Sequence, residues 1–195
     1  MNLNLFTEIL FWLFIFLPLH SYIFYPLMIW FISLFHKKNE LPSIFDLPFV
    51  SIIISAYNEE GVILSRIENI AIQNYDFNRL ELIIGSDCSS DNTNEILYSL
   101  SEKYSWLSVY TFDERRGKAA VLNDLVKKSN GSIIIFSDSN TEFERNAVYN
   151  LVKEFTSPII GGVSGKLELV EPLTYFEKSS QEKKYWEYEI HIKRL

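Results

Sequence analysis

Cysteine is almost absent from this sequence of 195 residues, in which Cys88 stands alone. One cysteine excludes a disulfide framework within the chain and a zinc site built on cysteines, and it fits a reducing compartment. Dense runs of lysine and arginine are also missing, and the net charge is −7. An acidic chain without a basic stripe is not typical of a general nucleic-acid binder, so no nucleic-acid partner is expected.

Two phosphate-binding motifs are missing as well. The sequence contains neither a GxGxxG pattern after a predicted strand nor a GxxxxGK[ST] pattern. Both motifs use glycines to bring backbone N–H groups against phosphate oxygens. Their absence disfavours a dinucleotide-dependent dehydrogenase and a P-loop nucleotide hydrolase.

Charged residues are missing from Ile9 to Phe35, an apolar run longer than the roughly 20 residues that cross a bilayer. Because the preceding residues contain no lysine or arginine, a cleavable signal peptide is disfavoured. We predict a single transmembrane segment over residues 1–38. The basic residues 36–38 follow the run, so the positive-inside tendency places the rest of the chain in the cytoplasm.

Polar and helix-breaking residues interrupt this apolar run at Pro18, His20, Ser21 and Pro26. They leave a kinked helix, a tight hairpin or a segment lying in the membrane interface as open alternatives to a straight span. Residues 39–48 contain two prolines and no periodicity, and we interpret them as a linker.

Strand and helix patterns alternate in the remaining domain, residues 49–195, which is long enough to bury a core. Such alternation predicts an α/β fold with a mostly parallel, Rossmann-like sheet and flanking helices. The predicted strands are Phe49–Ala56, Leu80–Gly85, Leu107–Phe112 and a fourth that begins at Ser132. The predicted helices extend to about Gln73, run from about Thr93 to Tyr104, and follow Asp113–Lys118.

Several local expectations follow from these patterns. The four consecutive apolar residues after Ser132 predict a buried strand. Either Ser90 or Asp91 is expected to cap the helix that starts near Thr93. The first helix should bury Val62, Ile63, Ile67 and Ile70, and the third Ala119, Ala120, Leu122, Leu125 and Val126.

Polar residues follow each predicted strand, where ligands of open α/β sheets bind. Asp138 and Asn140, separated by one residue, offer oxygen ligands for Mg²⁺ or Mn²⁺. Acidic residues also accept hydrogen bonds from a base or ribose, and basic residues neutralise phosphate. Taken singly, each group is as well explained as a cap, a turn or a solvated charge; together they predict a nucleotide-diphosphate site. The groups are Tyr57-Asn58-Glu59, Asp87 with Asp91, Arg115-Arg116-Gly117-Lys118, and Asp138 with Asn140.

Five segments, in this order and spacing, resemble glycosyltransferase family 2, with its GT-A fold, and especially its membrane-anchored polysaccharide-synthase branch. They are VSIIISAYNEE (50–60), ELIIGSDCSSDNT (81–93), RRGKAAVLN (115–123), IIIFSDSNTEF (133–143) and GGVSGKLEL (161–169). The resemblance implies transfer of a sugar, with inversion, from a nucleotide-diphospho-sugar to an acceptor hydroxyl. It implies a divalent cation, Mg²⁺ or Mn²⁺, held by Asp138 and Asn140.

The same resemblance implies a set of nucleotide-sugar-binding residues, with Asp87 recognising the base and a UDP-sugar favoured. They are Ala56, Tyr57, Asn58, Glu59, Asp87, Asp91, Arg116, Gly117, Lys118 and Asp138. The expected partners are this donor, a saccharide or lipid-linked acceptor, membrane lipid, and a second chain if one supplies the missing carboxyl-terminal half.

Three departures from the family pattern limit the prediction. Asn140 replaces the usual last acid of the metal motif, and Cys88 replaces a usual glycine. No aspartate follows Asp138, so we expect the general base to be absent from this chain, or to come from the acidic segment 176–194 through Glu182, Glu187 or Glu189. Two hypotheses stay open. The first is a membrane-anchored glycosyltransferase that is active or is completed by a partner chain, and the second is a non-catalytic nucleotide-sugar-binding remnant. A nucleotidyltransferase is a weaker third.

Overall fold

The computed structural model describes residues 3–35, 46–156 and 159–168. The chain divides into two compact units, residues 1–40 with 166–195 and residues 41–165. The acidic segment 176–194, with its candidate bases, lies outside the described residues. Each unit is described by itself.

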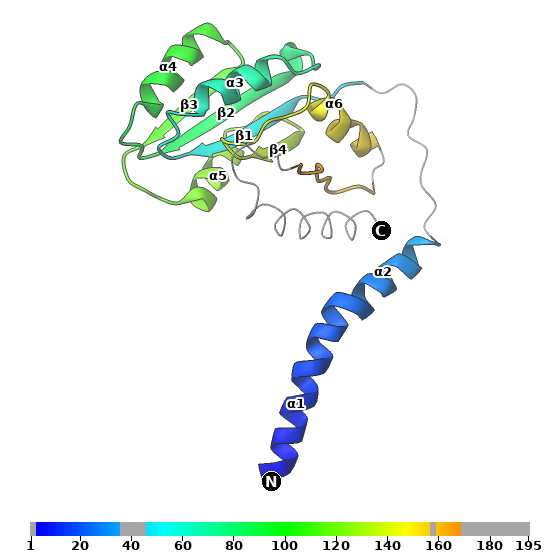
Figure 1. Ribbon diagram of the computed structural model, residues 1–195. Coiled ribbons are helices and arrows are strands. Elements are labelled where there is room, and N and C mark those ends of the chain that lie inside the picture. The colour runs from blue at the N-terminus through cyan, green and yellow to red at the C-terminus, as the bar shows by residue number, and fades with distance from the viewer. Residues whose placement is uncertain (1–2, 36–45, 157–158, 169–195) are drawn as a thin grey trace, which may run out of the picture. The chain divides into compact units, whose positions relative to one another are not determined.

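The amino-terminal segment is helical from Leu3 to Ser33 (Figure 1). Helix α1 (Leu3–Leu19) passes into a π-helical turn, His20–Phe24, and then into α2 (Tyr25–Ser33). The expected interruption is therefore a π turn between Pro18 and Pro26 and not a hairpin; a proline removes one backbone N–H from the helical ladder. From Leu5 to Ser33 the helix has 29 residues and a mean hydropathy of 1.6, sufficient in length and composition to cross a membrane.

The second unit contains a four-stranded sheet in the order β3-β2-β1-β4, and every neighbouring pair is parallel. The strands are β1 (Val50–Ala56), β2 (Leu80–Asp87), β3 (Leu107–Phe112) and β4 (Ile133–Ser137). This arrangement confirms the predicted parallel α/β sheet. Because the strands are parallel and in register, with Val50 opposite both Leu80 and Ile133, their carboxyl ends lie at one rim.

Helices cover both faces of the sheet (Figure 1). Helices α3 (Ile63–Ala71), α4 (Thr93–Lys103) and α6 (Ala147–Val152) contribute to one apolar cluster, and α5 (Lys118–Val126) packs on the opposite face. Two short 3₁₀ helices, Phe77–Arg79 and Lys153–Thr156, complete the elements of this unit. The result is a sheet between two helical layers.

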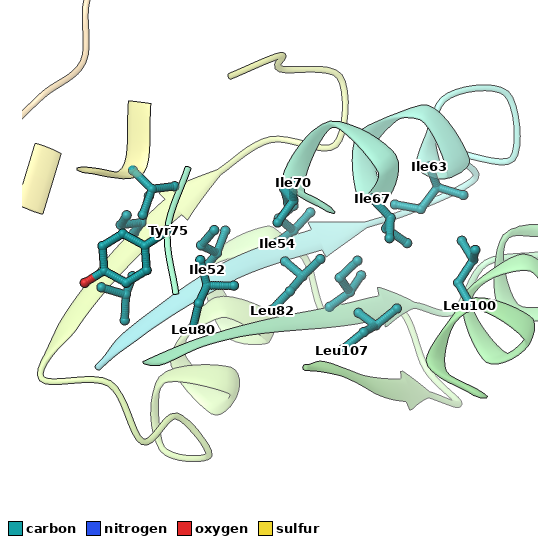
Figure 2. Packing of buried hydrophobic residues seen from close by; sticks show 14 of the residues in the cluster. Ile52, Ile54, Ile63, Ile67, Ile70, Tyr75, Leu80, Leu82, Leu100 and Leu107 are labelled. Atoms are coloured by element: carbon teal, nitrogen blue, oxygen red, sulfur yellow. The ribbon is translucent and has the colours of Figure 1, made fainter. Parts of the chain in front are cut away.

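The central strand β1 supplies both cores, because successive side chains of a strand point to opposite faces. Ile52 and Ile54 pack beneath Ile63, Ile67 and Ile70 of α3 (Figure 2). On the other face, a second cluster consists of Ile53, Ile83, Val121 and Leu125. Each fully buried isoleucine or leucine contributes about 1.5–3 kcal/mol relative to an exposed one.

Three local predictions need correction. Strand β4 is not fully buried: Ile135 is buried, but Phe136 is 58% exposed, because α5, the helix on that face of the sheet, packs mainly on β1 and β2. Helix α5 buries Leu125 and packs Leu122 and Val126 beside it, as predicted, but it also buries Val121, and Ala119 is exposed. Residues 119 and 121 lie roughly 200° apart around the helix. Strand β2 continues two residues beyond the prediction and includes Asp87.

One glycine is required where the turn before β4 approaches β1. A Cβ atom on Gly131 would lie 2.4 Å from the Ser51 backbone nitrogen and 2.8 Å from the Ile133 carbonyl oxygen. The Gly131 N–H donates to the Ser51 hydroxyl at 2.7 Å. The two backbones therefore leave no room for a side chain at this position.

We predict that Gly131→Ala lowers the free energy of unfolding by about 1–3 kcal/mol, because the added methyl group overpacks against backbone atoms. Thermal unfolding followed by circular dichroism measures the change. Gly61→Ala is the matched control, since a Cβ there meets nothing within 4 Å. Equal thermal midpoints for the two variants would contradict the prediction.

Candidate functional site

The loops after β1 and β2 are held together by reciprocal hydrogen bonds. The Asn58 side-chain oxygen accepts from the Ser90 backbone N–H at 2.9 Å, and the Asn58 backbone N–H donates to the Ser89 hydroxyl at 3.2 Å. Asn58 adopts a φ of 54°, in the left-handed region that asparagine tolerates better than most residues. This side chain, expected to contact a ligand, is engaged in joining the two loops.

Cys88 also has a positive φ, 59°, which explains why glycine suits this position of the family pattern. Its thiol donates to the Asp113 carbonyl oxygen at 3.3 Å. That contact links the loop after β2 to the loop after β3. That Cys88 is a tolerated substitution and not a nucleophile stays a prediction.

Asp91 joins the same two loops from the other side. Its carboxylate accepts from the Thr93 backbone N–H at 3.0 Å, at the start of α4, and from the Glu60 backbone N–H at 3.1 Å. Desolvation raises the pKa of Asp91, but hydrogen bonds from Thr93 and Glu60 outweigh it and hold that pKa below its ordinary value. Of the two predicted caps, Asp91 contacts the helix start and Ser90 does not.

Asp87 fixes the loop after β3 to the end of β2. Only 3% of this residue is exposed, and its two carboxylate oxygens accept from the Arg116 and Gly117 backbone N–H groups at 2.7 and 2.8 Å. Gly117 has a φ of 82°, a conformation that favours glycine, so the sequence Arg-Gly lets both N–H groups face one carboxylate. A carboxylate has about four lone-pair sites, so Asp87 retains acceptor capacity.

The three basic side chains of this loop have three different partners. The Arg115 guanidinium lies 3.4 Å from the centre of the Tyr57 ring, a cation–π contact. Arg116 pairs with Asp124 at 2.5 Å, and hydrogen bonds from Arg116 and Lys127 hold the pKa of Asp124 below its ordinary value. Lys118 forms an ion pair with Asp138. Lys118 is thus the basic residue that reaches the loop after β4, and the Arg116 side chain extends to α5.

The loop after β4 presents Asp138 and Asn140 on its exposed side, while Ser139 between them is 4% exposed and donates to Glu59 at 2.7 Å. One carboxylate and one amide oxygen fit a cation such as Mg²⁺, which keeps several waters and binds through one or two carboxylates plus substrate phosphates. Within the described ranges, no group of three or more histidine, cysteine, aspartate or glutamate residues forms a metal cluster. The remaining ligands of such a cation must come from elsewhere.

Of the predicted binding residues, two have side chains turned away from the rim. Ala56 is fully buried in the larger core, so only its backbone is available to a ligand. Arg116 is paired with Asp124. The structure brings the others together at one rim: Tyr57, Asn58, Glu59, Asp87, Asp91, Gly117, Lys118, Asp138 and Asn140.

Sequence reasoning missed Arg66, which is 2% exposed on α3. Its guanidinium donates to the Ser137 hydroxyl and the Asn69 side-chain oxygen, both at 2.8 Å, and lies 4.1 Å from the Phe143 ring centre. Burial lowers the pKa of Arg66 to about 10, against the attraction of Glu142 and Asp138. The available signal was an arginine directly before the apolar residue Ile67 on an otherwise amphipathic helix.

Comparison with known proteins identifies the family. A sequence model described as "Glycosyl transferase family 2" matches residues 51–194. This chain belongs to glycosyl transferase family 2. The probable glycosyltransferase YdaM of Bacillus subtilis is 35% identical over 129 residues, which cover 64% of this chain and 31% of that protein. The poly-beta-1,6-N-acetyl-D-glucosamine synthase of Staphylococcus aureus is 30% identical over 131 residues, 67% of this chain and 31% of the synthase.

A solved structure of the same architecture supports the GT-A assignment. The mannosyltransferase PcManGT from Pyrobaculum calidifontis, in complex with GDP-Man and Mn²⁺, superposes with a TM-score of 0.64 at 27% identity. The match covers 73% of this chain and 43% of the mannosyltransferase. The family 2 chain described here therefore spans about a third of the curated relatives and less than half of this structural neighbour.

We predict that Asp87→Asn lowers the free energy of unfolding by about 1–3 kcal/mol, because the amide would leave one of two buried N–H donors without an acceptor. Chemical denaturation followed by tryptophan fluorescence measures the effect. Asp113→Asn, an exposed change in the loop after β3, is the control and should alter stability little. If both variants unfold alike, Asp87 does not fix this loop.

The lowered pKa of Asp91 gives a prediction about pH. A carboxyl group with a depressed folded-state pKa contributes stability that is present above its ordinary value of 3.8 and is lost as the pH falls through the folded value. The thermal midpoint of Asp91→Asn should therefore lie below that of the native chain at pH 7, and the two should converge as the pH falls through the folded-state pKa of Asp91. A difference that is constant with pH would contradict this assignment.

Proposed function

We propose that this chain is the donor-binding part of a membrane-anchored, inverting glycosyltransferase, and that the rim formed by the four strand ends binds a nucleotide-diphospho-sugar. One observation carries the proposal: Lys118 and Asp138, from segments 20 residues apart, meet where Asp138 and Asn140 are both exposed. A cationic side chain beside paired oxygen ligands is the chemistry that a metal-bound diphosphate requires.

In this proposal, the nucleoside of the donor binds to the loops after β1 and β2. Tyr57, 37% exposed, offers a ring for stacking a base, and Asn58 and Glu59 border the same loop. Asp87 would accept a hydrogen bond from the base through its remaining lone pairs. Because Arg115 now covers Tyr57, a base that stacks there must displace or extend this cation–π contact.

The diphosphate of the donor would bind beside Lys118, Asp138 and Asn140. These two oxygen ligands would hold Mg²⁺ or Mn²⁺, which when bound stabilises negative charge on the departing nucleoside diphosphate. The Lys118–Asp138 pair is more than half exposed at both side chains, so solvent screens it and little energy is needed to separate it. Lys118 is then free to neutralise a phosphate oxygen, while its former partner serves as a ligand.

Transfer with inversion requires an acceptor hydroxyl to attack the anomeric carbon while a base takes its proton. We propose that this base lies outside the described residues, in the segment 176–194 through Glu182, Glu187 or Glu189, or on another chain. The similarity to the poly-beta-1,6-N-acetyl-D-glucosamine synthase supports cell-envelope or extracellular polysaccharide synthesis, with a saccharide or lipid-linked acceptor. A UDP-sugar is proposed as donor, and GDP is the comparison to test because the structural neighbour contains GDP-Man.

The helix from Leu5 to Ser33 is proposed as a membrane anchor. At 1.5 Å per residue its 29 residues extend about 43 Å, more than the roughly 30 Å hydrocarbon core of a bilayer. Because basic residues follow this helix, we propose that residues 49–195 lie in the cytoplasm, where nucleotide-sugars are made.

A second hypothesis is a nucleotide-sugar-binding module that transfers nothing by itself. Donor binding without turnover would distinguish this module from the transferase.

The test is calorimetric titration of UDP, and separately GDP, into the full chain in detergent, with Mn²⁺, with Mg²⁺ and with a chelator. We expect metal-dependent binding of UDP that weakens at least tenfold in Asp138→Ala, because the carboxylate ligand is lost. Glu144→Ala is the matched control, an exposed acid of the same segment. Binding that ignores both metal and Asp138, or no binding by folded protein, would overturn the donor site.

A further inference from the structure

Helix α3 carries a polar stripe beside its apolar one. Ile63, Ile67 and Ile70 face the sheet (Figure 2), whereas Arg66, Asn69 and Gln73 lie along the neighbouring side or just beyond the helix end. Residues spaced by three and four positions lie on one side of a helix. Arg66 bonds to Ser137, the last residue of β4, and Asn69 and Gln73 bond to the segment that follows it. Helix α3 therefore packs on the sheet with one stripe and holds this segment with the other.

The side chains of Asn69 and Gln73 form hydrogen bonds with backbone groups of this segment. The Asn69 side chain accepts from the Phe143 N–H at 2.8 Å and donates to the Phe143 carbonyl at 3.0 Å. Gln73 accepts from the Val148 N–H at 3.5 Å. These bonds fix the far end of the segment, after Asp138 and Asn140.

Arg66 fixes the near end. Its guanidinium donates to the Ser137 hydroxyl at 2.8 Å, and that hydroxyl donates in turn to the Asp138 carbonyl at 3.4 Å. A second guanidinium nitrogen bonds Asn69, and the Arg66 Nε atom is buried without a hydrogen-bond partner. The chain of bonds from Arg66 therefore reaches the backbone of Asp138 from beneath the rim.

Burial disfavours the charged form of Arg66, and the attraction of Glu142 and Asp138 does not offset this effect. An apolar residue at this position would provide neither the hydrogen bond to Ser137 nor the hydrogen bond to Asn69. The contacts of Arg66 thus favour a geometric role.

We propose that Arg66 is a positioning residue for the cation site: through Ser137 it holds Asp138, and with Asn69 it holds the segment that carries Asn140. The inference rests on the proposed function, because it assumes that Asp138 and Asn140 bind the divalent cation of the donor. Arg66 itself contacts neither cation nor donor.

The first arm of the test does not depend on metal. Hydrogen exchange of the backbone amides of residues 137–143 is measured in the metal-free full chain in detergent, for Arg66→Met, Ser137→Ala and the double variant. Faster exchange confined to this segment is expected in all three. Lys103→Met, which removes an exposed cation of α4, is the matched control and should leave the segment unchanged.

The second arm measures Mn²⁺ affinity by calorimetry in the presence of UDP. Arg66→Met and Ser137→Ala should each weaken it about tenfold, as loss of an outer partner of a metal ligand does. Because both act through one hydrogen bond, the double variant should be no weaker than Arg66→Met. Arg66→Lys, which retains the charge and one donor nitrogen, should recover part of the Mn²⁺ affinity that Arg66→Met loses.

The outcomes are distinguishable. Native exchange and native Mn²⁺ affinity in folded Arg66→Met overturn the positioning role and leave the donor site standing. Additive losses in the double variant also overturn it, because they show independent effects. Absence of Mn²⁺ and UDP binding by the native chain overturns both the proposed function and this inference. If Arg66→Met fails to fold, Ser137→Ala, which removes one half-buried hydroxyl, carries the test alone.

Discussion

The parallel pairing of β1 with β2 and β4 is the constraint on which the rest of this molecule depends. Parallel sheets are covered on both faces, and the isoleucines of β1 pack into two separate cores, one on each face. Because the strands are parallel and in register, the polar residues that follow them all lie at one rim of the sheet. The site is a consequence of the core, because the pairing that buries these isoleucines also sets the rim at which each strand ends.

At the rim, most side chains that the sequence predicted to bind a ligand are hydrogen-bonded to neighbouring loops. Asn58 and Asp91 join two loops, Asp87 holds a third, and Glu59 reaches Ser139 in the fourth. A loop fixed by several such bonds loses little conformational entropy when a ligand binds, which favours preorganised recognition. The same residues thus support the shape of the rim and border the surface that a donor would contact.

Fold class, element order and the location of the rim were predictable from the pattern of residues. Short β-branched runs that alternate with amphipathic helices are compatible with few topologies. The five segments that resemble the family indicated one of them. Full burial of β4 was a wrong prediction, because the run Ile133–Phe136 does not state which helices cover each face of the strand. The inward side of α5 was predicted only in part: Leu125 is buried with Leu122 and Val126 beside it, but Val121 was missed and Ala119 is exposed.

The sequence by itself determined which residues stand at the strand ends and the family to which the chain belongs, because order and spacing along the chain are enough for both. Only the tertiary structure decided how those residues are partnered. Arg116 is paired with Asp124 while Lys118 reaches Asp138, although the two basic residues are neighbours in sequence. The role of Arg66 was equally hidden, since its contact with Ser137 joins positions 71 residues apart, and only packing of α3 on the sheet brings them within hydrogen-bonding distance.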